Sequence, residues 1–318
     1  MNFRLVFDYL VYLALRLMIC GMQALSITVC ARISESLAYL MNDVLKIRGK
    51  LVDENLRHAF PDWSAEQRKD TARKMWYHLL LMVCEIAHAP RKMHDSNWRD
   101  HVDCHRVNEQ VKHLIGDRPV VILLGHFGNF EMMGYVAGIL GFPTHTVARP
   151  LDNKFLHNYI LKFRSATGQY ILPKDGSAPV IEQILDDGGT MALLCDQSAG
   201  HKGCWVKFFN RPASCHKAIS LFSLTSNAPL VVCYFRRKDA PMQFEMGVAG
   251  IFDPAEHEER SSVKELSLWY NQLLEEMVRR DPDQYWWVHN RWKDDRQKIK
   301  ELKKKRKQEK MAARKMAA

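Results

Sequence analysis

The sequence lacks the short motifs that mark several large enzyme classes. It contains no GxSxG, GxGxxG, GxxxxGK[ST] or HExxH, which argues against a serine hydrolase, a dinucleotide-dependent enzyme, a P-loop NTPase and a zincin. Its eight cysteines form no CxxC pair and lie mostly in apolar runs. We therefore expect reduced, buried thiols in a protein that faces the cytoplasm.

One group of side chains has the composition of a zinc site but lacks the spacing of one. It consists of Cys195, His201, Cys204, Cys215 and His216. Zinc sites use characteristic ligand spacings that this group does not match. We interpret its members as core thiols and loop histidines, and we expect no metal.

The basic charge is confined to the C-terminus. The 318 residues carry a formal net charge of +10 and are 47% apolar, which is enough to build a core and excludes a disordered chain. Residues 296–318 contain eleven Lys or Arg and two Glu, a net of +9, so the other 295 residues carry a net of only +1. Any partner attracted by charge must therefore meet this tail or a local patch.

An apolar N-terminal segment predicts a membrane-associated helix. Residues 5–31 carry charge only at Asp8 and Arg16, and 17–31 are uncharged. Fifteen helical residues cover about 22 Å, less than the roughly 30 Å hydrocarbon core. The segment is a poor match to a cleaved signal peptide. We expect a retained helix that either spans the membrane at a tilt or lies in its interface.

These features divide the chain into a membrane-anchoring helix (1–32), a catalytic domain (33–295) and a basic tail (296–318). Several basic residues follow the apolar helix: Arg32, Lys46, Arg48 and Lys50. Basic residues favour the cytoplasmic side of a membrane. The sequence therefore predicts a body that faces the cytoplasm and a tail attracted to an anionic inner leaflet.

Periodicity predicts an α/β fold with a largely parallel central sheet flanked by helices. Helices are expected over 33–60, 129–140, 153–167, 176–187, 214–226 and 261–280. A further helix of about 22 residues is expected to start at a capping box formed by Ser64 and Gln67. Strands are expected over 119–125, 144–149, 190–196, 229–237 and 242–250. The aromatic and basic cluster at 286–292 is interpreted as a membrane anchor or as core packing, the latter being favoured for Trp287.

His126 and Glu131 are the first candidates for chemistry. The His-x4-acid spacing alone carries no information, because about 1.6 such pairs are expected by chance and two occur. The placement is more specific, because His126 follows a buried strand at the end where open α/β sheets bind ligands. With Asn129 as a helix cap, His126 lies in the turn before the helix and Glu131 in its first turn. A carboxylate on one ring nitrogen would leave the other free as a general base.

Several sequence blocks together resemble the bacterial lipid A biosynthesis (lauroyl/myristoyl) acyltransferases, part of the glycerolipid acyltransferase superfamily. The blocks are NLRHAFPDWS (55–64), VVILLGHFGNFE (120–131), ARPLDNKFL (148–156), FRSATG (163–168), LLCDQSAGHKGCWVKFFNRPA (193–213) and YWWVHNRWK (285–293). The chain departs from the family pattern at Asn210, where the family usually has Gly, so the shape of that loop is in question.

The resemblance implies an acyl carrier protein thioester as donor, a hydroxyl of a lipid A precursor or related glycolipid as acceptor, and no cofactor or covalent acyl-enzyme. It implies that His126 deprotonates the hydroxyl and that Glu131 orients the histidine. Arg149 and Arg164 match arginines of the second block, which would bind a phosphate or the thioester oxyanion. Asp196 matches the acid of the third block and either pairs with one of these arginines or begins a turn.

Other functions remain open at this level. A different lipid acceptor, such as an aminoacyl lipid or another glycolipid, fits the same chemistry. Two alternatives come from other functional classes. One is a membrane-tethered protein that binds nucleic acid through the tail, and the other is a lipid-binding module without catalytic activity. The intact His/Glu pair argues against the inactive lipid-binding module, and we expect no nucleic-acid binding because the body is nearly neutral.

Overall fold

The computed structural model describes residues 3–256, 262–293, 300 and 304. The predicted basic tail therefore lies almost entirely outside the described residues. The helices are α1 (Phe3–Ala24), α2 (Ile27–Tyr39), a π-helical turn η1 (Leu40–Val44), α3 (Gly49–Ala59), α4 (Ala65–Lys92), the short 3₁₀ turn η2 (Trp98–Asp100), α5 (Val107–Leu114), α6 (Phe130–Ile139), α7 (Lys154–Ser165), α8 (Ala178–Asp186), α9 (Lys217–Thr225), α10 (Val263–Arg280) and the 3₁₀ turn η4 (Pro282–Gln284).

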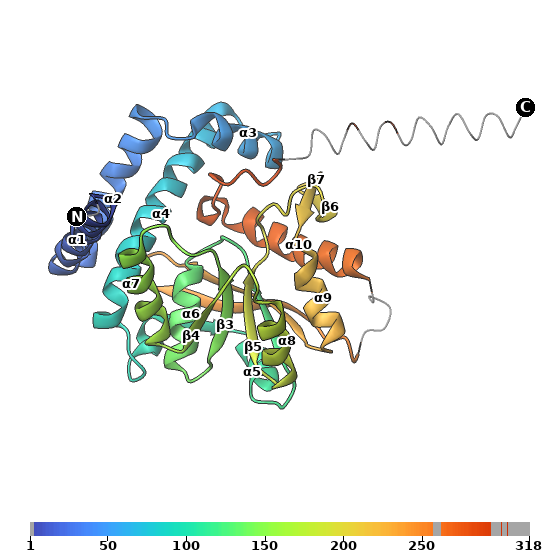
Figure 1. Cartoon of the computed structure of the whole chain (residues 1–318). Coiled ribbons are helices and arrows are strands. Elements are labelled where there is room, and N and C mark those ends of the chain that lie inside the picture. Colours follow the sequence, from blue (N-terminus) through green and yellow to red (C-terminus); the bar gives the residue numbers. More distant parts are fainter. Residues whose placement is uncertain (1–2, 257–261, 294–299, 301–303, 305–318) are drawn as a thin grey trace, which may run out of the picture.

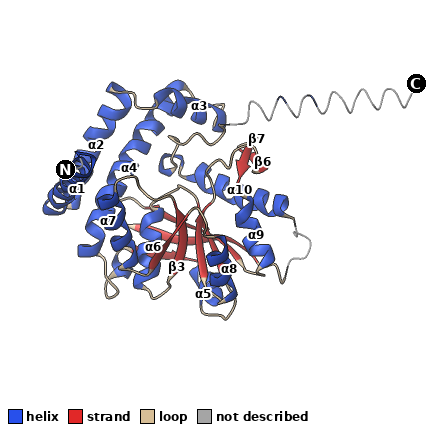
Figure 2. Ribbon diagram, viewed as in Figure 1, coloured by secondary structure: helices blue, strands red, loops and turns tan. Residues whose placement is uncertain are grey.

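The strands form one large sheet and a separate hairpin (Figure 2). They are β1 (Val102–His105), β2 (Val120–Leu124), β3 (Thr144–Ala148), β4 (Gln169–Pro173), β5 (Thr190–Leu194), β6 (Cys204–Phe208), β7 (Arg211–Cys215), β8 (Leu230–Arg237) and β9 (Phe244–Phe252). The sheet order is β1-β9-β8-β2-β5-β3-β4, and its one antiparallel pair is β8 with β9. The predicted α/β class with a largely parallel sheet is confirmed.

Strand β2 shows why the core has two layers. All five of its residues are buried, and their side chains alternate between the faces of the sheet. Val121 and Leu123 join a cluster that packs against α8, α9 and α10. Val120, Ile122 and Leu124 join a second cluster that includes α6 and the C-terminal half of α4. A strand covered on both faces gives the continuous apolar run seen in the sequence.

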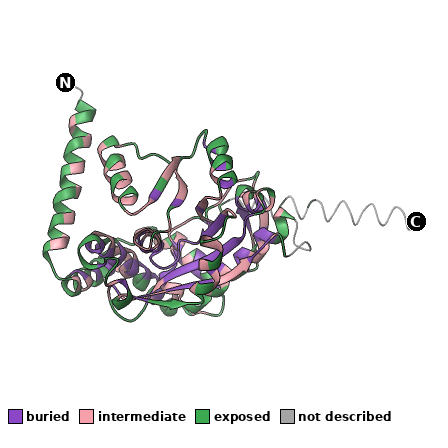
Figure 3. Ribbon diagram, turned by 90° about the horizontal axis from the view of Figure 1, so that it is seen from below, coloured by how far each residue is buried: buried purple, intermediate pink, exposed green. Residues whose placement is uncertain are grey.

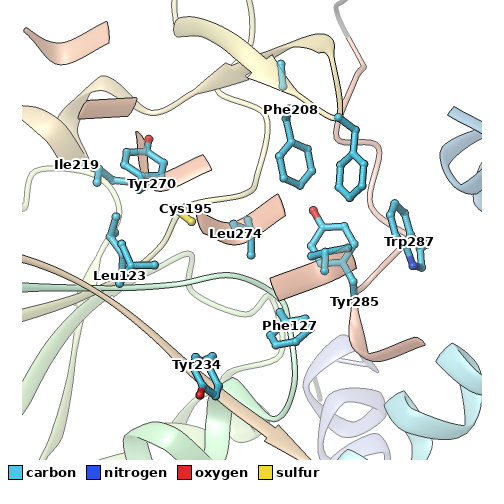
Figure 4. Close-up of a cluster of buried hydrophobic side chains, with 14 of the residues drawn as sticks. Leu123, Phe127, Cys195, Phe208, Ile219, Tyr234, Tyr270, Leu274, Tyr285 and Trp287 are labelled. Atoms are coloured by element: carbon cyan, nitrogen blue, oxygen red, sulfur yellow. The ribbon is translucent and has the colours of Figure 1, made fainter. Parts of the chain in front are cut away.

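The first of these clusters extends to the C-terminal aromatic segment. Figure 4 shows Phe127, Tyr285, Trp287 and Phe208 gathered in it beside Leu274 of α10. Trp287 is fully buried, which confirms core packing for this side chain. The nearby Arg291 and Trp292 are also buried, so the alternative of a membrane anchor is wrong for these three residues.

The predicted helix 33–60 is interrupted. Helix α2 ends in the π-helical turn η1, and α3 begins only at Gly49. Between them Lys46 and Arg48 adopt left-handed backbone conformations, with φ of 49° and 53°. Such residues cannot continue a right-handed helix, and the sequence here has no proline to mark the break. The next helix starts at Ser64 with the predicted capping box.

The hairpin β6–β7 was not predicted, and it explains the departure at Asn210. Its two-residue loop places Phe209 and Asn210 at φ of 48° and 56°. Two successive positive φ values match a type I′ turn, which suits the twist of a hairpin. Asn tolerates this conformation better than other residues with side chains. Asn210 therefore keeps the loop geometry that a glycine would also allow.

Helix α1 lies along the outside of the molecule, as Figure 3 shows. It is the one helix among the described residues that is long and apolar enough to cross a membrane, with mean hydropathy 1.8 and no buried residue. It nevertheless contacts α7. The guanidinium of Arg16 lies 4.8 Å from the centre of the Tyr159 ring, and Asn153 Nδ2 donates to Asp8 O at 2.8 Å.

Candidate active site

The turn between β2 and α6 places His126 at the carboxyl end of the sheet. Gly128 has φ +62°, and a Cβ there would lie 2.1 Å from Phe235 O, so only glycine fits. Asn129 caps α6 by accepting a hydrogen bond from Met132 N at 3.2 Å, as predicted. The turn is thus held against β8, with His126 directly beyond β2.

His126 forms a buried pair with Asp196. His126 Nδ1 lies 2.6 Å from Asp196 Oδ1, and the backbone N–H of His126 donates to Asp196 Oδ2 at 3.0 Å. Only 4% of His126 and 2% of Asp196 is exposed. Because the carboxylate accepts the Nδ1 proton, Nε2 carries the lone pair of the neutral ring. This arrangement holds the neutral ring in one tautomer and leaves Nε2 able to accept a proton.

The register of the sheet brings the two residues together. Strands β2 and β5 are parallel neighbours, and Leu124 pairs with Leu194. His126 and Asp196 each lie two residues beyond these partners, so they meet at the same edge. The sequence holds a weak signal for this pairing. Each strand ends in Leu-Leu, and one further residue separates that pair from His126 or Asp196.

The two charges of the pair stabilise each other. Burial lowers the pKa of His126, but the charge of Asp196 and its hydrogen bond outweigh this effect and leave the pKa above its ordinary value. Burial raises the pKa of Asp196, and the charge and hydrogen bonds of His126 more than reverse this, so the carboxyl group stays ionised. The site therefore favours an imidazolium that forms during a reaction.

Glu131 does not contact the ring of His126, contrary to our expectation. Its carboxylate binds the guanidinium of Arg164 through two hydrogen bonds, one of them between Arg164 Nε and Glu131 Oε2 at 3.1 Å. Glu131 lies in the first turn of α6 and faces α7, which carries Arg164. The histidine is oriented by Asp196 instead, and Glu131 acts on it only through its charge, which raises the pKa of His126 further.

The remaining predicted arginine lies apart from this pair. Arg149 follows β3, its side chain is 82% exposed, and its nearest ionic contact is Asp152 at 3.9 Å. Asp196, for which we considered an arginine partner, has His126 as its partner.

The C-terminal segment covers the histidine. Trp286 N donates to His126 O at 3.1 Å, and the two rings have centres 5.1 Å apart. The ring of His289 has its centre 4.6 Å from that of His126. Burial lowers the pKa of His289 to about 4, with a further contribution from the charge of His126. His289 is therefore neutral at neutral pH and does not compete with the charge that forms on His126.

Comparison with known proteins identifies the family of the chain. A model of the bacterial lipid A biosynthesis acyltransferase family matches residues 1–294. The chain belongs to this family. It is 24% identical over 255 residues to the lipid A biosynthesis palmitoleoyltransferase of Escherichia coli (strain K12), covering 78% of this chain and 80% of that protein. The lipid A biosynthesis acyltransferase of Shigella flexneri matches with the same identity and coverage. The protein is therefore an acyltransferase.

A buried polar network supports the active-site turn of the acyltransferase. Glu85 of α4 accepts two hydrogen bonds from Arg237 of β8 and one from Asn129 Nδ2 at 3.0 Å. Arg237 also contacts His78 Nδ1 at 2.6 Å, and His78 Nε2 lies 3.1 Å from Gly128 O. The network thus begins and ends on adjacent residues of the turn.

The protonation of His78 is determined by these two contacts. Because Gly128 O can only accept, Nε2 carries the proton and Nδ1 accepts from Arg237. Burial and the Arg237 charge both lower the pKa of His78, which keeps the ring neutral. No sequence motif indicated this network, which joins residues more than 150 positions apart.

The Cys/His group named in the sequence does not form a cluster of metal ligands, and Cys195 is unsuited to act as a nucleophile. No three His, Cys, Asp or Glu side chains among the described residues are arranged as metal ligands. Cys195, the cysteine next to Asp196, is buried, and burial raises the pKa of its thiol well above the ordinary value. A thiol that stays protonated is a poor nucleophile.

Proposed function

We propose that this acyltransferase moves a fatty acyl chain from an acyl carrier protein thioester to a hydroxyl of a lipid A precursor or a related envelope glycolipid. The observation that carries the proposal is the buried His126–Asp196 pair at the carboxyl end of the sheet, in which the neutral ring has its lone pair on Nε2. Family membership supports acyl transfer onto lipid A as the overall reaction.

In the proposed reaction the acceptor hydroxyl gives its proton to His126 Nε2 while its oxygen attacks the thioester carbonyl carbon. The resulting oxyanion collapses, the carbon–sulfur bond breaks, and the sulfur takes the proton from His126. An ester and a free thiol are the products, and His126 returns to its neutral form. Asp196 stabilises the transient imidazolium, as the acid does in a Ser-His-Asp triad.

The Glu131–Arg164 pair is proposed to hold the substrate near His126. The pair is half-buried, with side-chain exposures of 23% and 20%. A guanidinium held by a carboxylate on one edge keeps donors on the other edge for a phosphate. Arg149 is exposed enough to take a second phosphate group. We assign both arginines to substrate binding.

An apolar cavity supports a lipid substrate. It has a volume of about 220 Å³ and lies between α1, α4 and α7. Phe163, next to Arg164, lines one side of it, and Met18 and Ile19 of the N-terminal helix line another. An acyl chain placed there would lie between the membrane helix and the catalytic side chains.

The proposed location is the inner membrane, with the catalytic domain facing the cytoplasm. Helix α1 provides the membrane association, and the basic residues that follow it favour the cytoplasmic orientation. The tail at 296–318 would add electrostatic attraction to an anionic leaflet.

Transfer by the purified full-length protein tests the proposal. A lipid A precursor is supplied with either an acyl carrier protein thioester or the matching coenzyme A thioester, and the product is detected by mass spectrometry. We expect transfer from the carrier protein and a loss of roughly 10²–10⁴-fold in turnover for His126→Ala. A His126→Ala protein with nearly wild-type turnover would contradict the mechanism. Absence of transfer by the wild type from both donors would contradict the function, and transfer from coenzyme A alone would reassign the donor.

A further inference from the structure

Gln197 occupies the side of His126 where the reaction would take place. It follows Asp196 directly at the end of β5, but its side chain is exposed whereas Asp196 is buried. Its amide nitrogen Nε2 lies 3.4 Å from Nε2 of His126. Adjacent residues of one segment thus contact the two ring nitrogens of the same histidine.

The protonation of the ring determines what this amide does. In the neutral ring Asp196 accepts the proton of Nδ1, and Nε2 of His126 then has a lone pair and no proton. Gln197 therefore donates an N–H toward it. This contact occupies the position that an acceptor hydroxyl must take before it can transfer its proton, so substrate binding has to displace the amide.

We expect the displaced amide to stay close to the reacting carbonyl group. Gln197 directly follows Asp196, which accepts two hydrogen bonds from His126, and the N–H that faced the histidine is released when the hydroxyl arrives. Two other donors lie near His126: the indole N–H of Trp286, which is buried without a hydrogen-bond partner, and the ring of His289, whose centre is 4.6 Å away. Among the described residues, Gln197 is the side chain with a hydrogen bond to Nε2 of His126.

We propose that Gln197 is a catalytic residue that donates an N–H hydrogen bond to the thioester carbonyl oxygen as it becomes an oxyanion. Side-chain amides serve this purpose in acyl transfer. The proposal rests on the proposed function, because it concerns the tetrahedral intermediate of the same reaction. The amide gives up no proton in this step. The electron pair moves onto the carbonyl oxygen when the new carbon–oxygen bond forms, and it returns when the carbon–sulfur bond breaks.

Three substitutions of Gln197 test the proposal in the full-length protein. Gln197→Ala should lower kcat by about 10–10³-fold and change KM for either substrate by less than about threefold, because the lost interaction exists only in the transition state. Gln197→Glu should be slower still, since a carboxylate has no N–H and repels the oxyanion. Gln197→Asn retains the amide on a shorter side chain and should recover part of the loss.

A pH series and a matched control complete the experiment. Gln197→Ala removes no charge, so the acid limb of the pH–rate profile should stay in place, whereas Gln197→Glu should move it to higher pH. Gln183→Ala on the surface of α8 deletes the same side chain away from the site and should retain wild-type turnover. Thermal unfolding of each variant measures its folding.

The results separate this proposal from the proposed function. Wild-type kcat in Gln197→Ala, or a loss confined to KM, would overturn the role of Gln197 while leaving the reaction itself established. Equal kcat for the Glu and Ala variants would also overturn it, because oxyanion stabilisation requires the carboxylate to be worse. A wild-type protein that transfers no acyl chain would instead refute the proposed function.

Discussion

Asp196→Asn is the substitution that most directly tests the histidine pair. Asp196 accepts two hydrogen bonds from His126, one from the backbone N–H and one from Nδ1 of the ring. Asparagine has a single side-chain oxygen. The backbone N–H can only donate, so it takes that oxygen, and the amide NH₂ then faces the ring. The histidine must respond by placing its proton on Nε2, where it cannot act as a base.

The magnitude follows from the tautomer. The same acid-to-amide change in a Ser-His-Asp triad leaves the geometry intact and lowers kcat by about 10⁴-fold. That factor corresponds to about 5.4 kcal/mol of transition-state free energy. Asp196 is likewise buried and bound to Nδ1 of the histidine, so we expect a loss of this order. The lost carboxylate charge should also lower the pKa of His126 and move the acid limb of the pH–rate profile to lower pH.

The assay is single-turnover acyl transfer followed by mass spectrometry of the lipid product from pH 5 to 9. Asp187→Asn, an acid-to-amide change at the exposed end of α8, is the matched control and should retain wild-type turnover. Turnover of Asp196→Asn within about tenfold of wild type would refute the reasoning, because the wrong tautomer cannot sustain general-base catalysis.

Further predictions concern the surroundings of the site. Activity should fall as the pH is lowered, with a midpoint above 6.5 in kcat/KM, because the base form of His126 is lost below its raised pKa. Glu131→Gln and Arg164→Gln should each lower turnover by about 10–10²-fold, and the double variant should be no slower, since a pair that acts as a unit is non-additive; multiplying effects would show separate roles. Glu85→Ala should lower the free energy of unfolding in urea by about 3–5 kcal/mol, because it leaves a buried guanidinium without its partner. Asn210→Ala should cost about 1 kcal/mol by the same measurement, and Asn210→Gly should cost less, because only the alanine is strained at positive φ.

Local signals predicted most of the elements but not the contacts between them. The buried strand at 120–124, the capping box at Ser64 and the Asn129 cap are determined within a few residues, and each was confirmed. The short strand β4 was missed because its apolar run, 170–172, is only three residues long. The break at Lys46 was missed because nothing in its composition indicates a left-handed conformation.

The active-site pairing depended on register between distant strands. The spacing from His126 to Glu131 suggested a local pair, whereas the carboxylate that contacts the ring is 70 positions away. Only the order of strands in the sheet makes Asp196 a neighbour of His126. Parallel sheets are built from such non-local pairings, so a motif search along the chain found His126 but not the carboxylate that contacts its ring.

The packing of α1 against α7 would determine how far the active site lies from the membrane. The contacts from Asp8 to Asn153 and from Arg16 to Tyr159 join α1 to the helix that carries Arg164. We expect α7 to move with α1 when α1 associates with a membrane, and Arg164 would then be held at a fixed height above the lipid. The distance between the bilayer and the active site would then be set by two packed helices and not by a flexible linker. A glycolipid hydroxyl at the matching distance from the lipid tails would contact His126, and hydroxyls nearer to or farther from the tails would not.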